Sequence, residues 1–218
     1  MATTFPETTR IVPGAAKAAK PQVRTAERRT AILDAATAVF GARGYNSGSL
    51  VEIADLVGMT HAGILHHFGT KEQLLLAVLA HRDGADLERI VDHERPVGDA
   101  YLDHLVHTAQ YATDRVSAIK ASAVLSAESV TGNHPAQEHF RERFSGMRDR
   151  VATDLALAVG LEADDARVVT AAAAVVAATE GLQVQWLLDP LRVDMPGTLR
   201  FVIDATVATL RQSAAAPR

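Results

Sequence analysis

Three histidines, His61, His66 and His67, lie close together within residues 49–76. An imidazole can bind zinc, transfer a proton or form hydrogen bonds with a nucleic acid, so the spacing has to decide between these roles. Histidines that bind one metal from a single helix are usually three or four residues apart, whereas these are separated by five and one. No carboxylate lies among them. We therefore expect no metal or other cofactor at this position.

A second pair, His104 and His107, has better spacing for a metal and lies beside Asp103. Histidines are common on exposed helix faces, however, and we assign this pair no metal role. The sequence contains no cysteine, which excludes thiolate ligands, disulfides and thiol nucleophiles. We find no nucleophile–base arrangement, glycine-rich phosphate loop or glutamate–histidine metal motif. A helical enzyme, or an adaptor that does not bind DNA, remains as an alternative to a DNA-binding protein.

Helix start and stop signals surround the three histidines. Ser49 and Thr70 are each followed three residues later by Glu or Gln, the spacing of a capping box. Between them, Gly58 ends one short helix and Thr60 caps the next. These signals predict helices over 50–57 and 61–67, separated by the turn 58–60, and a longer helix from 71 onward.

An earlier helix, over 25–43, has to cover these short helices. Its apolar side chains repeat at three and four residues, and Gly44 follows as a left-handed C-cap. The turn is too tight for the two short helices to lie antiparallel, so we expect them to cross steeply. Their inner faces should pack on the first helix through Ile53, Ala54, Val57, Ile64 and Phe68.

The helix over 61–67 then keeps mainly Ile64 and part of Leu65 for the core. Its outer side combines small and hydrogen-bonding side chains, which would let the helix approach base edges in a DNA major groove. The caps at Ser49 and Thr60 leave helix starts that attract phosphate, and Lys71 adds a positive charge at the rim. The predicted outward residues are His61, Ala62, Gly63, His66 and His67.

The composition favours an all-α fold. Of the 218 residues, 48% are hydrophobic and only 5% aromatic, alanine is abundant, and long period-two alternation is missing. Up to Arg82 there are nine Lys/Arg against six Asp/Glu, a balance of +3, whereas the rest of the chain carries −7. This asymmetry favours an N-terminal part that contacts an anion.

We divide the chain into three parts: a disordered tail over 1–22, a helix-turn-helix DNA-binding domain over 23–70, and a larger helical domain over 71–218. Further helices are predicted over 71–93, 99–113, 116–130, 136–159, 164–188 and 195–212. The N-terminus lacks the apolar stretch of a signal peptide. The apolar run 168–182 is too short for a membrane span and is interrupted by Glu180. We therefore expect a cytoplasmic protein without a membrane contact.

Residues 24–80 resemble the N-terminal domain of TetR-family transcriptional regulators. The matching motifs are Phe-Gly-x-x-Gly-Tyr at 40–45, Ser49 with Ile53-Ala54, Val-Gly-Met-Thr at 57–60, His67-Phe68, and Lys-Glu-x-Leu at 71–74. The resemblance implies a homodimer that binds a palindromic double-stranded DNA operator, usually to repress. It also implies that the C-terminal domain binds a small-molecule effector and dimerises.

The sequence departs from the family at one position of the recognition helix. Leu65 stands where the family most often has a tyrosine that contacts phosphate, and His66 and His67 could supply such contacts instead. Val51, at a position that reaches a base in some relatives, could offer an apolar contact.

The last two helices are predicted to form the dimer interface. The small residues of 168–178 would allow close approach, and the final helix carries a matching stripe. Trp186 is interpreted as a core or interface residue and not as a ligand contact. The stripe consists of Leu199, Val202, Ile203, Thr206 and Leu210.

Overall fold

The computed structural model describes residues 21–91 and 96–215, and all regular secondary structure in this part of the chain is helical, as predicted. They form α1 (Pro21–Ser47), α2 (Leu50–Leu56), α3 (His61–Phe68), α4 (Lys71–Val91), α5 (Asp99–Gln110), a 3₁₀ helix (Ala112–Arg115), α6 (Val116–Ser129), α7 (Gln137–Val159), α8 (Ala166–Leu188) and α9 (Met195–Ala215). The helix predicted over 99–113 thus ends at Gln110 and is followed by the 3₁₀ turn. Of the tail predicted over 1–22, residues 1–20 lie outside the described part, whereas Pro21 and Gln22 already belong to α1.

The N-terminal core joins α1, α2 and α3 to the first half of α4. Phe40 of α1, Ile53 of α2 and Ile64 of α3 are completely buried in it. The core also takes in Leu74, Leu75, Val78 and Leu79 of α4, Ala121 and Leu125 of α6, Ala136 just before α7, and Phe140 of α7. The division at residue 70 remains a prediction, because α4 and α6 bury side chains in the same core as the helix-turn-helix.

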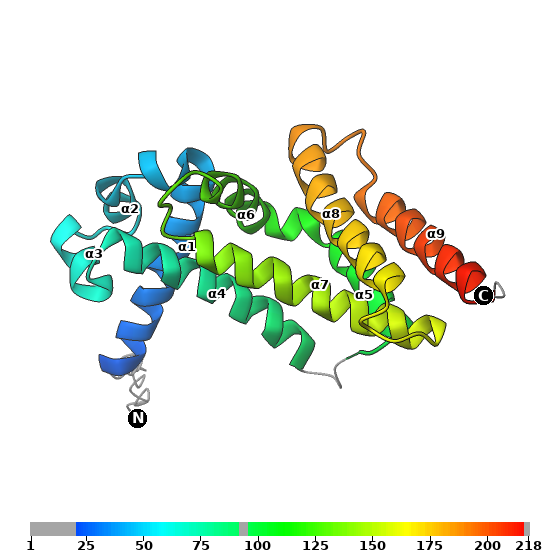
Figure 1. Ribbon diagram of the computed structural model, residues 1–218. Coiled ribbons are helices and arrows are strands. Elements are labelled where there is room, and N and C mark those ends of the chain that lie inside the picture. The colour runs from blue at the N-terminus through cyan, green and yellow to red at the C-terminus, as the bar shows by residue number, and fades with distance from the viewer. Residues whose placement is uncertain (1–20, 92–95, 216–218) are drawn as a thin grey trace, which may run out of the picture.

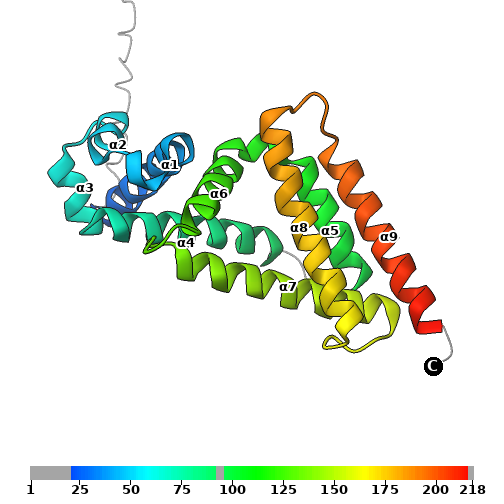
Figure 2. The same cartoon turned by 45° about the horizontal axis from the view of Figure 1, so that its top comes forward.

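A contact that we call the Glu128 joint fastens α6 to the end of α1. It consists of Gly44, Tyr45, Glu128 and His134. The Tyr45 amide donates to Glu128 Oε2 at 2.6 Å, and His134 Nε2 lies 3.8 Å from the same oxygen. The Tyr45 and His134 rings meet edge to face at 5.3 Å. Figure 2 shows α6 beside α1 at this contact.

A second core lies among α5, α7, α8 and α9, at the end of the molecule opposite α2 and α3 (Figure 1). Leu199, Ile203 and Leu210 of α9 are at most 3% exposed and pack in this core. The predicted stripe therefore does match α8, but within one chain. Its assignment to the dimer interface is wrong for these three residues, because their side chains are already covered by the chain's own helices.

Helix α8 is long and apolar enough, by length and composition alone, to cross a membrane. The prediction that this apolar run is too short is thus corrected by the 23-residue helix Ala166–Leu188. One face of α8, with Val168, Ala172 and Val175, is completely buried in the C-terminal core. Its apolar character is therefore explained in part by packing against neighbouring helices.

Replacing Gly44 by alanine should destabilise the protein. Gly44 has φ 74° and ψ 175°, a backbone region that is essentially restricted to glycine. Holding another residue in this region costs about 1–3 kcal/mol. An added Cβ would also meet the Glu128 carboxylate, which the Tyr45 amide holds in place. We expect Gly44→Ala to lower the free energy of unfolding, measured by urea denaturation, by at least this amount.

The control is Gly146→Ala on α7, where an added Cβ has open space and the helix would gain stability. Equal stabilities of Gly44→Ala and the native protein would contradict the account of this position.

Candidate nucleic-acid interface

Helices α2 and α3 form a helix-turn-helix whose ends are fixed by the predicted caps. The Ser49 hydroxyl accepts from the Val51 amide at 3.2 Å, and the Thr60 hydroxyl accepts from the Gly63 amide at 3.1 Å. Gly58, with φ 66°, makes the left-handed turn between the helices. Each cap satisfies one free amide at a helix start and leaves the other amides available to an anion.

The capping box predicted at Ser49 is incomplete. Glu52 does not return to the start of its own helix, because its carboxylate pairs with Arg43 Nε of α1 at 2.9 Å. At the start of α4, the Gln73 backbone amide donates to the Thr70 hydroxyl at 3.0 Å. The ion pair between Glu52 and Arg43 thus takes the place of the second hydrogen bond of the capping box and connects α2 to α1.

The outer face of α3 has the predicted mixture of small and polar groups. His61, Ala62 and His66 are exposed, whereas Gly63 and His67 are partly buried. A Cβ at Gly63 would come within 3.1 Å of Met59 Cε, so the glycine allows the turn to pack closely on α3. Ile64 is completely buried and Phe68 is 6% exposed, which fixes α3 with the opposite face outward.

Two residues at the edges of the helix-turn-helix differ in exposure. Leu65 is half-buried, and Val51 is 55% exposed on α2. An exposed apolar side chain at the start of α2 is available for contact with another molecule. The DNA contacts assigned to the ten predicted residues stay a prediction.

Lys71 is drawn toward the end of α1. Its Nζ donates to the Asn46 carbonyl at 3.2 Å and lies 4.7 Å above the Tyr45 ring. Partial burial lowers the pKa of Lys71, and the nearby Glu128 carboxylate opposes this shift. The residue therefore fixes the start of α4 while placing a positive charge beside the helix-turn-helix.

Arg29 is a neighbour of α3 that sequence reasoning missed. Its Nη1 donates to the His67 carbonyl at 3.1 Å, and its guanidinium lies 4.2 Å above the Phe68 ring. A cation at this helix end is favoured by the free carbonyls there. Because Arg29 lies 38 residues before His67, no local spacing could have indicated the contact.

Within the described part of the chain, no group of three or more His, Asp or Glu side chains could hold a metal ion. His104 Nε2 lies 3.4 Å from the Thr108 hydroxyl, and burial, together with His107, lowers the pKa of His104.

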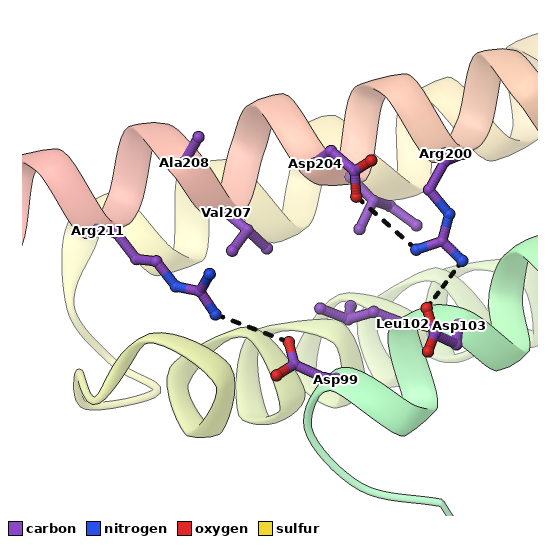
Figure 3. A pocket seen from close by; sticks show the side chains of 9 residues that line it. Asp99, Leu102, Asp103, Arg200, Asp204, Val207, Ala208 and Arg211 are labelled. Carbon is purple, nitrogen blue, oxygen red and sulfur yellow. Dashed lines mark ion pairs between the residues drawn. The ribbon is translucent and has the colours of Figure 1, made fainter.

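A cleft of about 370 Å³ lies between α5 and α9, far from the helix-turn-helix (Figure 3). Arg200 pairs with Asp103 at 2.8 Å, and Arg211 lies 4.0 Å from Asp99. These side chains are between 38% and 70% exposed, so water screens the pairs. The cleft is a solvated seam that joins the two helices.

The fold, a helix-turn-helix carried on a larger α-helical body, is that of the helix-turn-helix class of proteins. The family model described as "Bacterial regulatory proteins, tetR family" matches residues 32–78. The chain is 33% identical over 129 residues to an HTH-type transcriptional repressor of Mycobacterium tuberculosis, and the match spans 59% of this chain but only 63% of that relative.

Solved structures agree with this fold. A transcriptional regulator from Rhodococcus sp. Rha1 superposes with a TM-score of 0.69 at 19% identity, covering 87% of this chain and 99% of that one. The complex of SmeT with triclosan gives a TM-score of 0.67 at 20% identity, covering 84% and 91%. Over residues 32–78 the chain carries the N-terminal domain of the TetR family of bacterial regulatory proteins. The matched relative is named as a repressor, which favours a regulator over the enzyme alternative.

The Thr60 cap should contribute measurably to the stability of the N-terminal domain. Thr60→Ala removes the acceptor of the Gly63 amide and should lower the free energy of unfolding by about 1 kcal/mol. Thr60→Ser keeps the acceptor and should remain close to the native protein. Urea denaturation checks both, and equal losses in the two variants would show that the hydroxyl does not act as the cap.

Proposed function

We propose that this protein is a transcriptional repressor that binds a palindromic operator as a homodimer and is released from it by a small-molecule effector. The single observation that supports DNA reading best is the outer face of α3, where exposed His61, Ala62 and His66 follow a capped helix start. A protein with this function acts in the bacterial cytoplasm. The repressor from M. tuberculosis and the SmeT–triclosan complex support repression and ligand response by similarity only.

DNA binding would use two kinds of contact. Small side chains on α3 let the helix axis approach the groove floor, so that His61 can reach a base edge. The exposed starts of α2 and α3, at Ser49 and Thr60, present amides to phosphate. His66, in the last turn of α3, and Lys71, at the start of α4, would add further phosphate contacts. Val51 would add an apolar contact, for instance with a thymine methyl.

The homodimer would form through the faces of α8 and α9 that the chain's own core leaves open. On α8 these faces carry Ala177, Gly181 and Val184, and an added Cβ at Gly181 would have open space. On α9, Phe201 is 72% exposed and lies one turn from Ala205. Small side chains around one aromatic ring suit close packing between two copies.

The His61→Ala variant tests base reading. Because His61 is exposed and follows the Thr60 cap, its loss should leave no cavity and change the melting temperature little. The sequences selected from a pool of DNA fragments should lose preference at one symmetric pair of operator positions, since a base contact discriminates by roughly 1–3 kcal/mol.

The matched control is His107→Ala, which removes an exposed histidine from α5. An unchanged selected profile for His61→Ala would remove this residue from the reading face. Failure of the native protein to select any DNA sequence would refute the proposed function itself.

The Val184→Asp variant tests the interface. Val184 is 46% exposed in one chain, so the folded monomer should tolerate a carboxylate there. An unpaired charge buried between two copies is costly, and sedimentation should show a folded monomer. Val130→Asp, at an 81% exposed position after α6, is the control and should stay dimeric. A dimeric, folded Val184→Asp protein would move the interface elsewhere.

A further inference from the structure

A cluster of charged side chains lies where α4, α7 and α8 meet. Arg143 Nη1 of α7 donates to Asp83 Oδ1 of α4 at 2.8 Å, and His139 Nε2 of α7 lies 3.3 Å from Asp83 Oδ2. The Arg143 side chain is 17% exposed and the His139 side chain 21% exposed. Glu180 of α8 is close enough for its charge to interact with Arg143 and Arg82. We call Asp83, His139, Arg143 and Glu180 the α4–α7–α8 cluster.

Two donors of this cluster are not satisfied within the chain. Arg143 Nε is buried without a hydrogen-bond partner. His139 Nε2 lies near Asp83, but the geometry does not make a hydrogen bond, so this nitrogen has no partner either. Leaving a buried charged donor without an acceptor is costly. Both atoms belong to one helix and are four residues apart, so one small acceptor between them could be shared.

Charged groups of both signs surround the two unsatisfied donors. Arg143 and Arg82 both act on Glu180 and His139, while Asp83 is the carboxylate in contact with Arg143. Burial raises the pKa of Glu180, and the charges of Arg143 and Arg82 oppose this shift. Burial also lowers the pKa of His139, which keeps its ring neutral and still able to donate one proton. The Arg143 and Arg82 guanidinium groups thus lie near His139 together with the Asp83 and Glu142 carboxylates.

Phe140 and Phe144 extend along α7 beside these polar groups. Phe140 lies edge to face with His139 at 5.4 Å, and its ring is 6.1 Å from Phe144. Phe144 is partly buried and packs against both hydrophobic cores. Buried and partly buried apolar side chains therefore continue from the unsatisfied donors toward the boundary between the cores.

We propose that the α4–α7–α8 cluster binds the carboxylate of an apolar organic acid, with Arg143 Nε and His139 Nε2 as donors. Guanidinium and carboxylate match in charge and planar geometry, which favours this anion over a neutral group. The proposal rests on the proposed function, because it names the chemical class of the effector.

The position of the cluster gives such a ligand a route to the DNA-binding domain. Asp83 lies on the same helix as Leu74 and Leu75, which are completely buried in the N-terminal core. A carboxylate that engages Arg143 Nε and His139 Nε2 would lie beside the Asp83 carboxylate, and repulsion between the two charges would weaken the attachment of α4 to α7. The ligand would then have different affinities for the arrangement in which α4 is attached to α7 and the one in which it is not. Such a difference in affinity is what shifts an equilibrium between two states.

The α5–α9 cleft does not offer the same chemistry. Each of its guanidinium groups already has a carboxylate near it, and these side chains are open to water.

The test uses the full-length protein, calorimetric titration, and matched pairs of probes: benzoate with benzamide, and octanoate with octanamide. Each carboxylate should bind and its amide should not. Arg143→Met should weaken carboxylate binding by about ten- to a hundredfold, the value of one charge-assisted hydrogen bond. Arg148→Met is the control, because Arg148 is exposed on the same helix, and should bind as the native protein does.

A second variant keeps the proposal falsifiable if Arg143→Met does not fold. Glu180→Gln removes the chain's own competing acid and should leave carboxylate binding unchanged or make it tighter. Equal binding of acids and amides, undiminished binding by folded Arg143→Met, weaker binding by Glu180→Gln, or no binding of either acid would overturn the proposal. Equal displacement by inorganic phosphate would do so as well, because it would show a general anion site.

DNA binding is measured separately, so the two failures can be told apart. A protein that selects an operator but binds no acid refutes only the ligand class. One that binds acids at Arg143 but selects no DNA refutes the proposed function and leaves the carboxylate site in place.

Discussion

The hydrogen bond from the Tyr45 amide to the Glu128 carboxylate is the contact on which the position of the helix-turn-helix depends. α3 is held against α1 by Ile64 and Phe68, and the end of α1 is held against α6 by Glu128. The glycine-only backbone of Gly44 leaves room for that carboxylate. Lys71, above the Tyr45 ring, brings the start of α4 to the same place. The orientation of α3 is thus set by the rest of the chain through this joint.

Local features of the fold could be predicted from the sequence, because their causes lie within a few residues. The Thr60 cap, the turn at Gly58 and the burial of Ile64 follow from spacing along one helix or turn. Contacts between distant residues could not be predicted in this way. Glu52 pairs with Arg43 in place of its own helix start, and Arg29 reaches His67 across 38 residues. Likewise, periodicity identified the apolar stripe with Leu199 but could not show whether it faces its own chain or a second copy.

The TetR-like fold accounts for the architecture, and two contacts along α4 connect its parts. At its start, Lys71 contributes to the Glu128 joint; two-thirds along, Asp83 contacts Arg143. A change in the partner of Asp83 would therefore act on the helix that also fixes the reading face. This arrangement gives a physical path from a bound acid to DNA release, without any contact between the acid and α3.

Hydrogen exchange at the Tyr45 amide tests whether Glu128 fixes the end of α1. In the native protein this amide should be protected, because it donates to a carboxylate at 2.6 Å. In Glu128→Ala its exchange should be faster by about tenfold or more, the equivalent of one lost hydrogen bond, while amides inside α7 keep their rates. Unchanged exchange at Tyr45 in a folded Glu128→Ala protein would contradict the account.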